Sequence, residues 1–107
     1  MYTMQRYQTA EGKDVVGDWL AGLDDRRARA RVLVRLDRLE AGNPGDCRPV
    51  REGVHELRVD YGPGYRVYFC MVGKMVVLLL CGGDKSSQKA DVERAIANKK
   101  DHEERHK

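Results

Sequence analysis

The chain has 107 residues, of which 41% are hydrophobic and 35% are charged. This length fits one compact domain with a modest core, and this balance excludes a disordered chain. Lys and Arg number 20 against 17 Asp and Glu, and the resulting net charge of +3 is too small to indicate nucleic-acid binding by itself.

Cysteine usage and hydropathy predict a soluble, cytoplasmic protein with no membrane contact. No apolar signal region follows the polar start Met1–Arg6, and the longest apolar run, Met75–Cys81, is far below the roughly 20 residues that span a bilayer. The three cysteines form no CxxC pair and are expected to be buried and reduced. They do not group with the three histidines, so we expect neither a metal nor a cofactor.

In the first half of the chain the apolar spacing predicts one strand and two helices. Residues Tyr2–Tyr7 alternate weakly, as in a short strand, and Asp14–Leu23 carries apolar residues at helical spacing. Asp24-Asp25 is a plausible cap for a second helix that runs to about Ala41 and ends at Gly42-Asn43-Pro44-Gly45. The short connection predicts a helical hairpin.

The second predicted helix carries a basic stripe beside its apolar one. Its members recur every three or four residues: Arg27, Arg31, Arg35 and Arg38. Such a stripe is most often a solvated face, whose long stems can cover apolar surface. The alternatives are contact with an acidic surface or with RNA phosphates.

In the second half the period changes to that of strands. Val54–Asp60 alternates, Gly62-Pro63-Gly64 is a turn, and Tyr65–Val72 and Met75–Cys81 predict two further strands in an antiparallel meander. Ser86 or Ser87 then caps a short last helix. The prediction is an α+β fold: an N-terminal helical hairpin packed on one face of a small twisted antiparallel sheet, with a short C-terminal helix.

One domain is predicted over residues 1–97. The remaining residues, 98–107, are charged and lack apolar side chains, so they are interpreted as a flexible tail.

Three charged residues of the predicted hairpin are candidates for chemistry. Glu56 and Arg58 share one face of their strand, and a turn at Gly62-Pro63-Gly64 brings Arg66 close to Arg58. Two guanidinium groups on one surface form a phosphate clamp, and Glu56 could orient an arginine or accept a proton. The spacing alone favours an ordinary exposed face of Glu–Arg pairs, each of which contributes little to stability.

Lys85 is the fourth candidate. It follows Gly82-Gly83 at the end of a buried strand and precedes a helix start, where backbone N–H groups and the helix dipole favour anions. A solvated lysine in a strand-to-helix turn explains the same pattern. His55 is out of phase with Glu56 and is interpreted as a packing residue.

Several segments taken together resemble a known family. The stretch Val54–Phe69 looks like the central hairpin of the addiction-module killer proteins, a HigB-like branch of the RelE/ParE toxin superfamily. The stretch Leu78–Gln88 is similar to the second signature of that branch, and residues 35–46 also fit. The similarity covers about Tyr2 to Ile96.

The resemblance implies a microbial-ribonuclease-like toxin fold, a neutralising antitoxin partner in a hetero-oligomer, and cleavage of messenger RNA, often on the ribosome, without a metal. It carries over Arg66 as the recurrent active-site arginine, Lys85 as a second basic residue, and Arg58 and Glu56 as part of the branch's own pattern. Ribosome-dependent relatives have further lysines, and sometimes a Tyr or His near the C-terminus, for proton transfer, where this chain has Asp91 or Glu93.

The resulting hypothesis is a toxin that acts as an endoribonuclease. Arg66 and Arg58 would stabilise the charged transition state, Lys85 would hold the phosphate or act as acid, and Glu56 is the candidate base, although flanking arginines would weaken it. Two alternatives remain: a ParE-like, non-enzymatic inhibitor of DNA gyrase, and a nontoxic RNA- or protein-binding relative.

Overall fold

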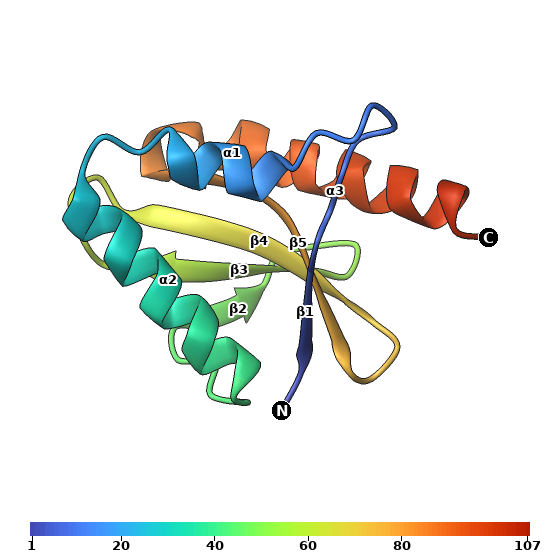
Figure 1. Cartoon of the computed structure of the whole chain (residues 1–107), viewed down its shortest axis with the longest axis horizontal. Coiled ribbons are helices and arrows are strands. Elements are labelled where there is room, and N and C mark those ends of the chain that lie inside the picture. The colour runs from blue at the N-terminus through green and yellow to red at the C-terminus, as the bar shows by residue number, and fades with distance from the viewer.

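The computed structural model describes all residues from 1 to 107. Its elements are, in chain order, β1 (Thr3–Arg6), α1 (Val15–Ala21), α2 (Arg26–Glu40), β2 (Cys47–Pro49), β3 (Val54–Val59), β4 (Tyr65–Val72), β5 (Val76–Asp84), the single 3-10 turn η1 (Lys85–Ser87) and α3 (Gln88–Arg105) (Figure 1). None of the helices combines the length and the apolar character that a membrane crossing requires.

The two predicted N-terminal helices are confirmed, and acidic caps set where they begin. The Asp14 carboxylate accepts a hydrogen bond from the Gly17 N–H, and the Asp25 carboxylate accepts from the N–H groups of Arg27 and Ala28. These bonds satisfy backbone donors that have no partner within the first turn. The pair is further joined by Arg29, whose side chain donates to the carbonyls at the C-terminal end of α1.

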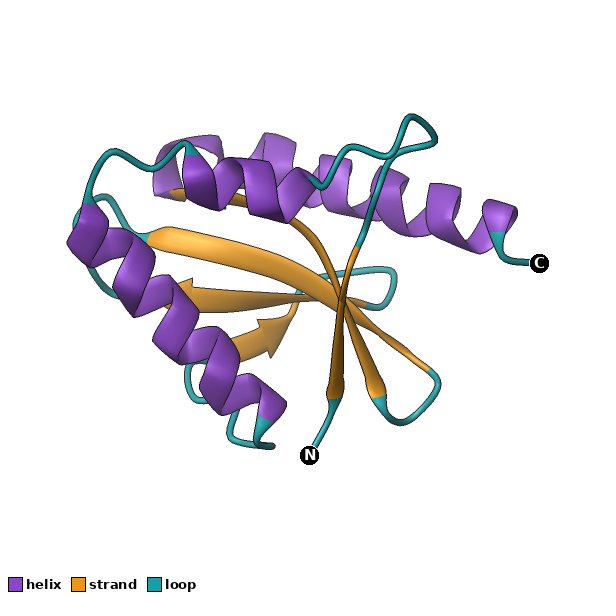
Figure 2. Ribbon diagram, viewed as in Figure 1, coloured by secondary structure: helices purple, strands orange, loops and turns teal.

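The fold is α+β, but the predicted sheet is wrong because the sheet is mixed. The strand order is β1-β5-β4-β3-β2, and β1 pairs with β5 in parallel while the other pairs are antiparallel. Figure 2 shows the resulting twist, with β1 crossing the view steeply and β3 running nearly level. Residue alternation reports which face a side chain takes and does not report strand direction, so it cannot indicate the parallel pair.

The predicted packing on a single face of the sheet is also wrong. One buried cluster joins the α1 and α2 side chains, among them Val16 and Val32, to Leu57 and Val67 of the sheet. A second cluster on the opposite face joins Ala95 and Ile96 of α3 to Tyr68 and Leu80. In Figure 1, α2 and α3 accordingly lie on opposite sides of the strands.

The predicted short last helix is wrong, because α3 has 18 residues and continues through most of the segment predicted to be a flexible tail. Polar contacts replace the missing apolar ones: the Tyr7 hydroxyl donates to Asp101 at 2.5 Å, and the Asn98 amide donates to the Leu80 carbonyl. Two ion pairs at i,i+4 spacing add support, Lys99–Glu103 and Arg105–Asp101. The predicted boundary at residue 97 therefore falls inside a helix.

These differences correct the fold that the family resemblance implies. A RelE/ParE-like, microbial-ribonuclease-like arrangement with an antiparallel sheet and a short last helix does not describe this chain. The sheet has a parallel edge strand, and a long helix covers its second face.

Candidate functional site

The strand register brings the charged residues of the hairpin together. Arg58 on β3 lies directly opposite Arg66 on β4, and Glu56 lies between Arg48 on β2 and Tyr68 on β4. Because residues that face each other on neighbouring strands share a face of the sheet, these five side chains form one polar cluster. It lies on the face that α3 covers.

Glu56 is at the centre of this cluster and is fully buried. One carboxylate oxygen, Oε1, lies 3.2 Å from Nε of Arg48 and 3.8 Å from Nε of Arg58. The other, Oε2, accepts hydrogen bonds from the Tyr68 hydroxyl at 3.1 Å and from the Gln88 amide at 2.8 Å. A buried carboxylate requires such partners, so the cluster satisfies Glu56 and leaves it no path to solvent.

Arg66 is the buried member of the arginine pair, with an exposed fraction of 5%. Its Nε lies 3.6 Å from Oε2 of Glu56, too far for a hydrogen bond, and has no other hydrogen-bond partner. Its Nη1 donates to the Gly64 carbonyl at 2.8 Å. These two contacts fix the guanidinium group between the buried carboxylate and the turn that follows β3.

Arg58, Arg66 and Lys85 line one pocket of about 420 Å³. The turn between β3 and β4 forms its rim, with Gly62, Pro63 and Gly64, and two carboxylates, Asp46 and Asp60, also line it. We call this the cationic pocket. It joins three of the four candidate residues, while Glu56 lies beneath it.

Lys85 is held at the pocket by the capped turn η1. The Asp84 carboxylate accepts from the N–H and hydroxyl groups of Ser86, and these hydrogen bonds lower the pKa of Asp84. Gly83 allows the following helix to approach, because a Cβ atom there would overlap the Asp91 carboxylate. Gly83 thus serves packing at the start of α3, while Gly82 packs against the Trp19 ring of α1.

Sequence reasoning missed two members of the cluster, Arg48 and Tyr68, and also Gln88, which donates to Glu56. Arg48 lies on the three-residue strand β2, which is too short to give a periodic signal. Tyr68 shares its face with Arg66, and this alternation could have identified it. Burial, followed by the neighbouring Glu56 carboxylate, raises the pKa of the Tyr68 hydroxyl, which therefore remains a hydrogen-bond donor.

The other polar residues considered from the sequence, His55, Asp91 and Glu93, make contacts that stabilise the fold. His55 stacks on Phe69 with ring centroids 5.3 Å apart, on the face opposite Glu56. Asp91 is buried and is bonded to Ser87 and Arg94, and Glu93 pairs with Arg51. No group of three or more His, Cys, Asp or Glu side chains is arranged to hold a metal ion.

The fold and the site together define a class: a small α+β protein with a cationic pocket built over a buried glutamate. Comparison with known families then identifies the family. Residues 18–100 match the model of the family described as "Phage derived protein Gp49-like (DUF891)", and the chain belongs to this family.

A relative in Haemophilus influenzae is 48% identical over 77 residues, which are 72% of this chain and 78% of that protein. It is described as an uncharacterized protein. The matched family region includes α2, the cationic pocket and most of α3.

Proposed function

We propose that this protein is the toxin of a type II toxin–antitoxin pair, of the HigB-like kind, and that it cuts messenger RNA during translation. The observation that carries the proposal is the convergence of Arg58, Arg66 and Lys85 on one open pocket. Three cations around a space of this size suit a phosphodiester with its charged transition state. The family resemblance of the hairpin and of the Leu78–Gln88 segment supports the same function.

The proposed reaction is attack of a ribose 2′-oxygen on the adjacent phosphorus, with breakage of the bond to the 5′-oxygen. It leaves a 2′,3′-cyclic phosphate and a 5′-hydroxyl. Arg66 and Arg58 stabilise the extra negative charge on the phosphorus oxygens, and the Lys85 ammonium gives a proton to the leaving oxygen. The proton of the 2′-hydroxyl passes to a carboxylate on the solvent side of the pocket, Asp46 or Asp60.

In this proposal Glu56 is a positioning residue. The sequence hypothesis made it the candidate base, but its complete burial and its five partners favour a different role. Glu56 holds the side chains of Arg58 and Arg66 at fixed places before substrate arrives. Such preorganisation is a main source of electrostatic catalysis.

The partner implied by this function is an antitoxin that covers the cationic pocket. A protein that neutralises three converging cations needs an acidic or carbonyl-rich segment at this place. The gene beside that of the toxin is the first candidate for the antitoxin.

The test is induced expression of the wild-type protein and of the Arg66→Ala variant, each with and without the neighbouring gene. We expect the wild type to stop growth, the neighbouring gene to restore it, and Arg66→Ala to be at least about 100-fold less toxic because transition-state charge is no longer stabilised. Arg66→Lys, which keeps the charge but not the fork of donors, should be intermediate. A folded Arg66→Ala protein with full toxicity would overturn the proposal.

A further inference from the structure

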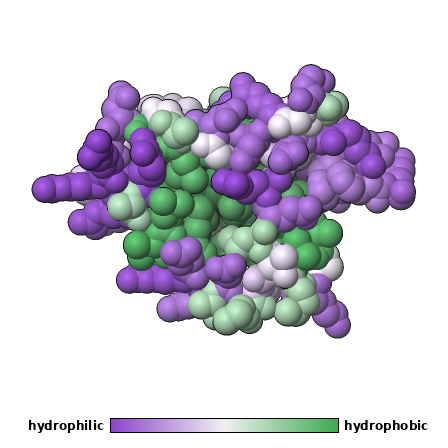
Figure 3. All heavy atoms as spheres, in the orientation of Figure 1, coloured by the Kyte–Doolittle hydropathy of each residue, from purple (hydrophilic) through white to green (hydrophobic).

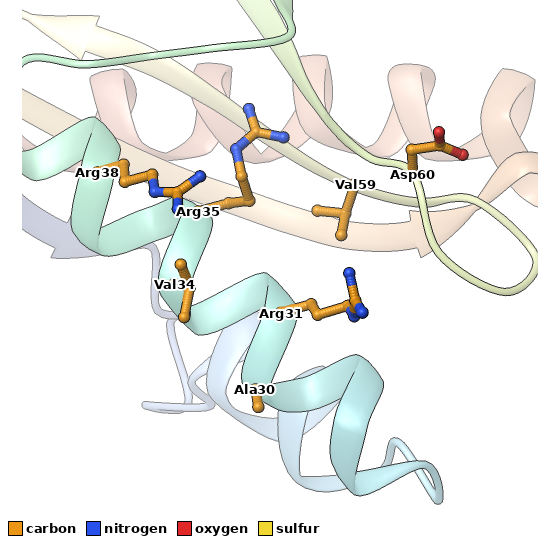
Figure 4. Close-up of a pocket in the computed structure, with 7 residues that line it drawn as sticks. All are labelled: Ala30, Arg31, Val34, Arg35, Arg38, Val59 and Asp60. Carbon is orange, nitrogen blue, oxygen red and sulfur yellow. The ribbon is translucent and has the colours of Figure 1, made fainter.

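A second basic groove runs along α2, outside the cationic pocket. It has a volume of about 410 Å³, and its walls are the basic side of α2 and the end of β3. Figure 4 shows the side chains of Arg31, Arg35 and Arg38 leaving α2 on one side, with Val59 and Asp60 across from them. We call this space the α2 groove.

The α2 groove and the cationic pocket are neighbours. Val59 and Asp60 line both spaces, so the end of β3 is their common wall. A ligand that extends beyond the cationic pocket on this side therefore enters the α2 groove. A polymer with a charge on every unit fits such a pair of adjoining basic spaces better than a single small anion does.

The arginines of the groove differ in how they are held. Arg35 is tied to the fold, because it donates to the carbonyls of Arg58, Pro44 and Asp46. Arg31 and Arg38 are exposed and form no ion pair or side-chain hydrogen bond, although Arg31 lies 4.6 Å from the centre of the Tyr61 ring. Their charges are thus available to a ligand.

The opposite side of α2 has a different character. A groove of about 270 Å³ there is mostly apolar, with Leu33 and Met4, and its charged residues are Arg6, Asp37 and Glu40. Figure 3 shows this apolar area between α2 and β1 on the visible face. Arg31 and Arg38 therefore lie on the side of α2 that adjoins the cationic pocket, and the mostly apolar groove lies on its other side.

We propose that the α2 groove binds the nucleotides next to the cleaved phosphate of a single-stranded RNA, an inference that rests on the proposed function. Arg31 and Arg38 neutralise backbone phosphates outside the cationic pocket. The exposed apolar surface of Val34, and the guanidinium plane of Arg31 against Tyr61, provide faces on which a base can stack. The groove increases affinity for longer RNA and does not take part in bond breakage.

The test measures binding of two uncleavable 2′-O-methyl oligonucleotides, a dinucleotide and a strand several times longer, by fluorescence anisotropy over a range of salt. The Arg31→Gln/Arg38→Gln protein should bind the longer strand about tenfold more weakly than the wild type and the dinucleotide equally well. The slope of its log affinity against log salt should fall by about 0.7 for each phosphate that the variant no longer neutralises. The matched control is Arg26→Gln/Arg27→Gln, which removes two exposed arginines of the same helix that do not line the groove.

Arg31→Lys/Arg38→Lys should recover most of the affinity, which separates loss of charge from loss of fold. Equal weakening by the control pair, or an unchanged affinity in the Arg31→Gln/Arg38→Gln protein, would overturn the inference while leaving the proposed function intact. Polyglutamate could also compete with the longer strand. If it displaces that strand from the wild type but not from Arg31→Gln/Arg38→Gln, and this variant binds RNA as tightly as the wild type, the groove binds an acidic protein instead of RNA. A wild-type protein that binds neither oligonucleotide would contradict the proposed function itself.

Discussion

Glu56 determines the geometry of the cationic pocket because it is the only carboxylate buried among the arginines. Its contacts come from β2, β3, β4 and the start of α3. Two of its ion-pair partners, Arg48 and Arg58, are partly exposed, so solvent screens their contribution. The contacts with buried Arg66 and Tyr68, and with the partly buried Gln88, therefore account for most of what Glu56 contributes.

Replacement of Glu56 by Gln should lower the free energy of unfolding by about 2 kcal/mol, because the buried Arg66 then lacks its only ion-pair partner. Urea unfolding followed by circular dichroism measures this. Glu93→Gln is the control, since the Glu93–Arg51 pair is half exposed and its loss should cost less than about 0.5 kcal/mol. Equal effects of the two substitutions would show that Glu56 does not anchor the arginines.

At the scale of elements, α2 has two tasks: it covers one face of the sheet and presents basic side chains beside the cationic pocket. Its buried stripe and its basic stripe are both readable from residue spacing, and so are its acidic cap and its end. Residue spacing does not predict the side-chain hydrogen bonds of Arg35, because the carbonyl groups that accept them lie 9 to 23 residues away in the chain. Likewise, the polar contacts that keep α3 helical beyond residue 97 join it to Tyr7 and Leu80, which no local pattern predicts.

The cap of α2 gives a prediction at this scale. Asp25→Ala removes the acceptor for two N–H groups at the start of the helix and should cost about 1 kcal/mol of stability. Asp24→Ala, one residue earlier and without a capping bond, should cost much less. Thermal unfolding of both variants compares them directly, and an equal loss of stability would argue that helix-dipole charge, rather than the cap, holds this end of α2.

At the scale of the whole molecule, the fold has two hydrophobic cores, one on each face of the sheet. The three cysteines differ in their relation to these cores: Cys70 and Cys81 are buried in the core under α3, and Cys47 is partly exposed.

The sequence predicted the α+β class, the meander of β3, β4 and β5, and the approach of Arg58 to Arg66. It could not predict the parallel edge strand or the second covered face, because both depend on where distant segments meet.

Thiol labelling tests this packing. Burial raises the pKa of Cys70 to about 11 and that of Cys81 to about 12, so both thiols are protonated and enclosed at mildly alkaline pH. We expect iodoacetamide to label only Cys47 in the folded protein and all three cysteines in concentrated urea, as read by mass spectrometry. Rapid labelling of Cys81 without denaturant would contradict a closed core beneath α3.

The central claim is that Arg58, Arg66 and Lys85 form a pocket that cleaves RNA. The most direct measurement is mapping of RNA 5′ ends across the transcriptome shortly after induction of the wild-type and Arg66→Ala proteins. We predict new ends with a 5′-hydroxyl inside translated messages for the wild type and none for Arg66→Ala. Growth arrest with broken DNA and an unchanged set of RNA ends would contradict the claim and indicate a gyrase inhibitor instead.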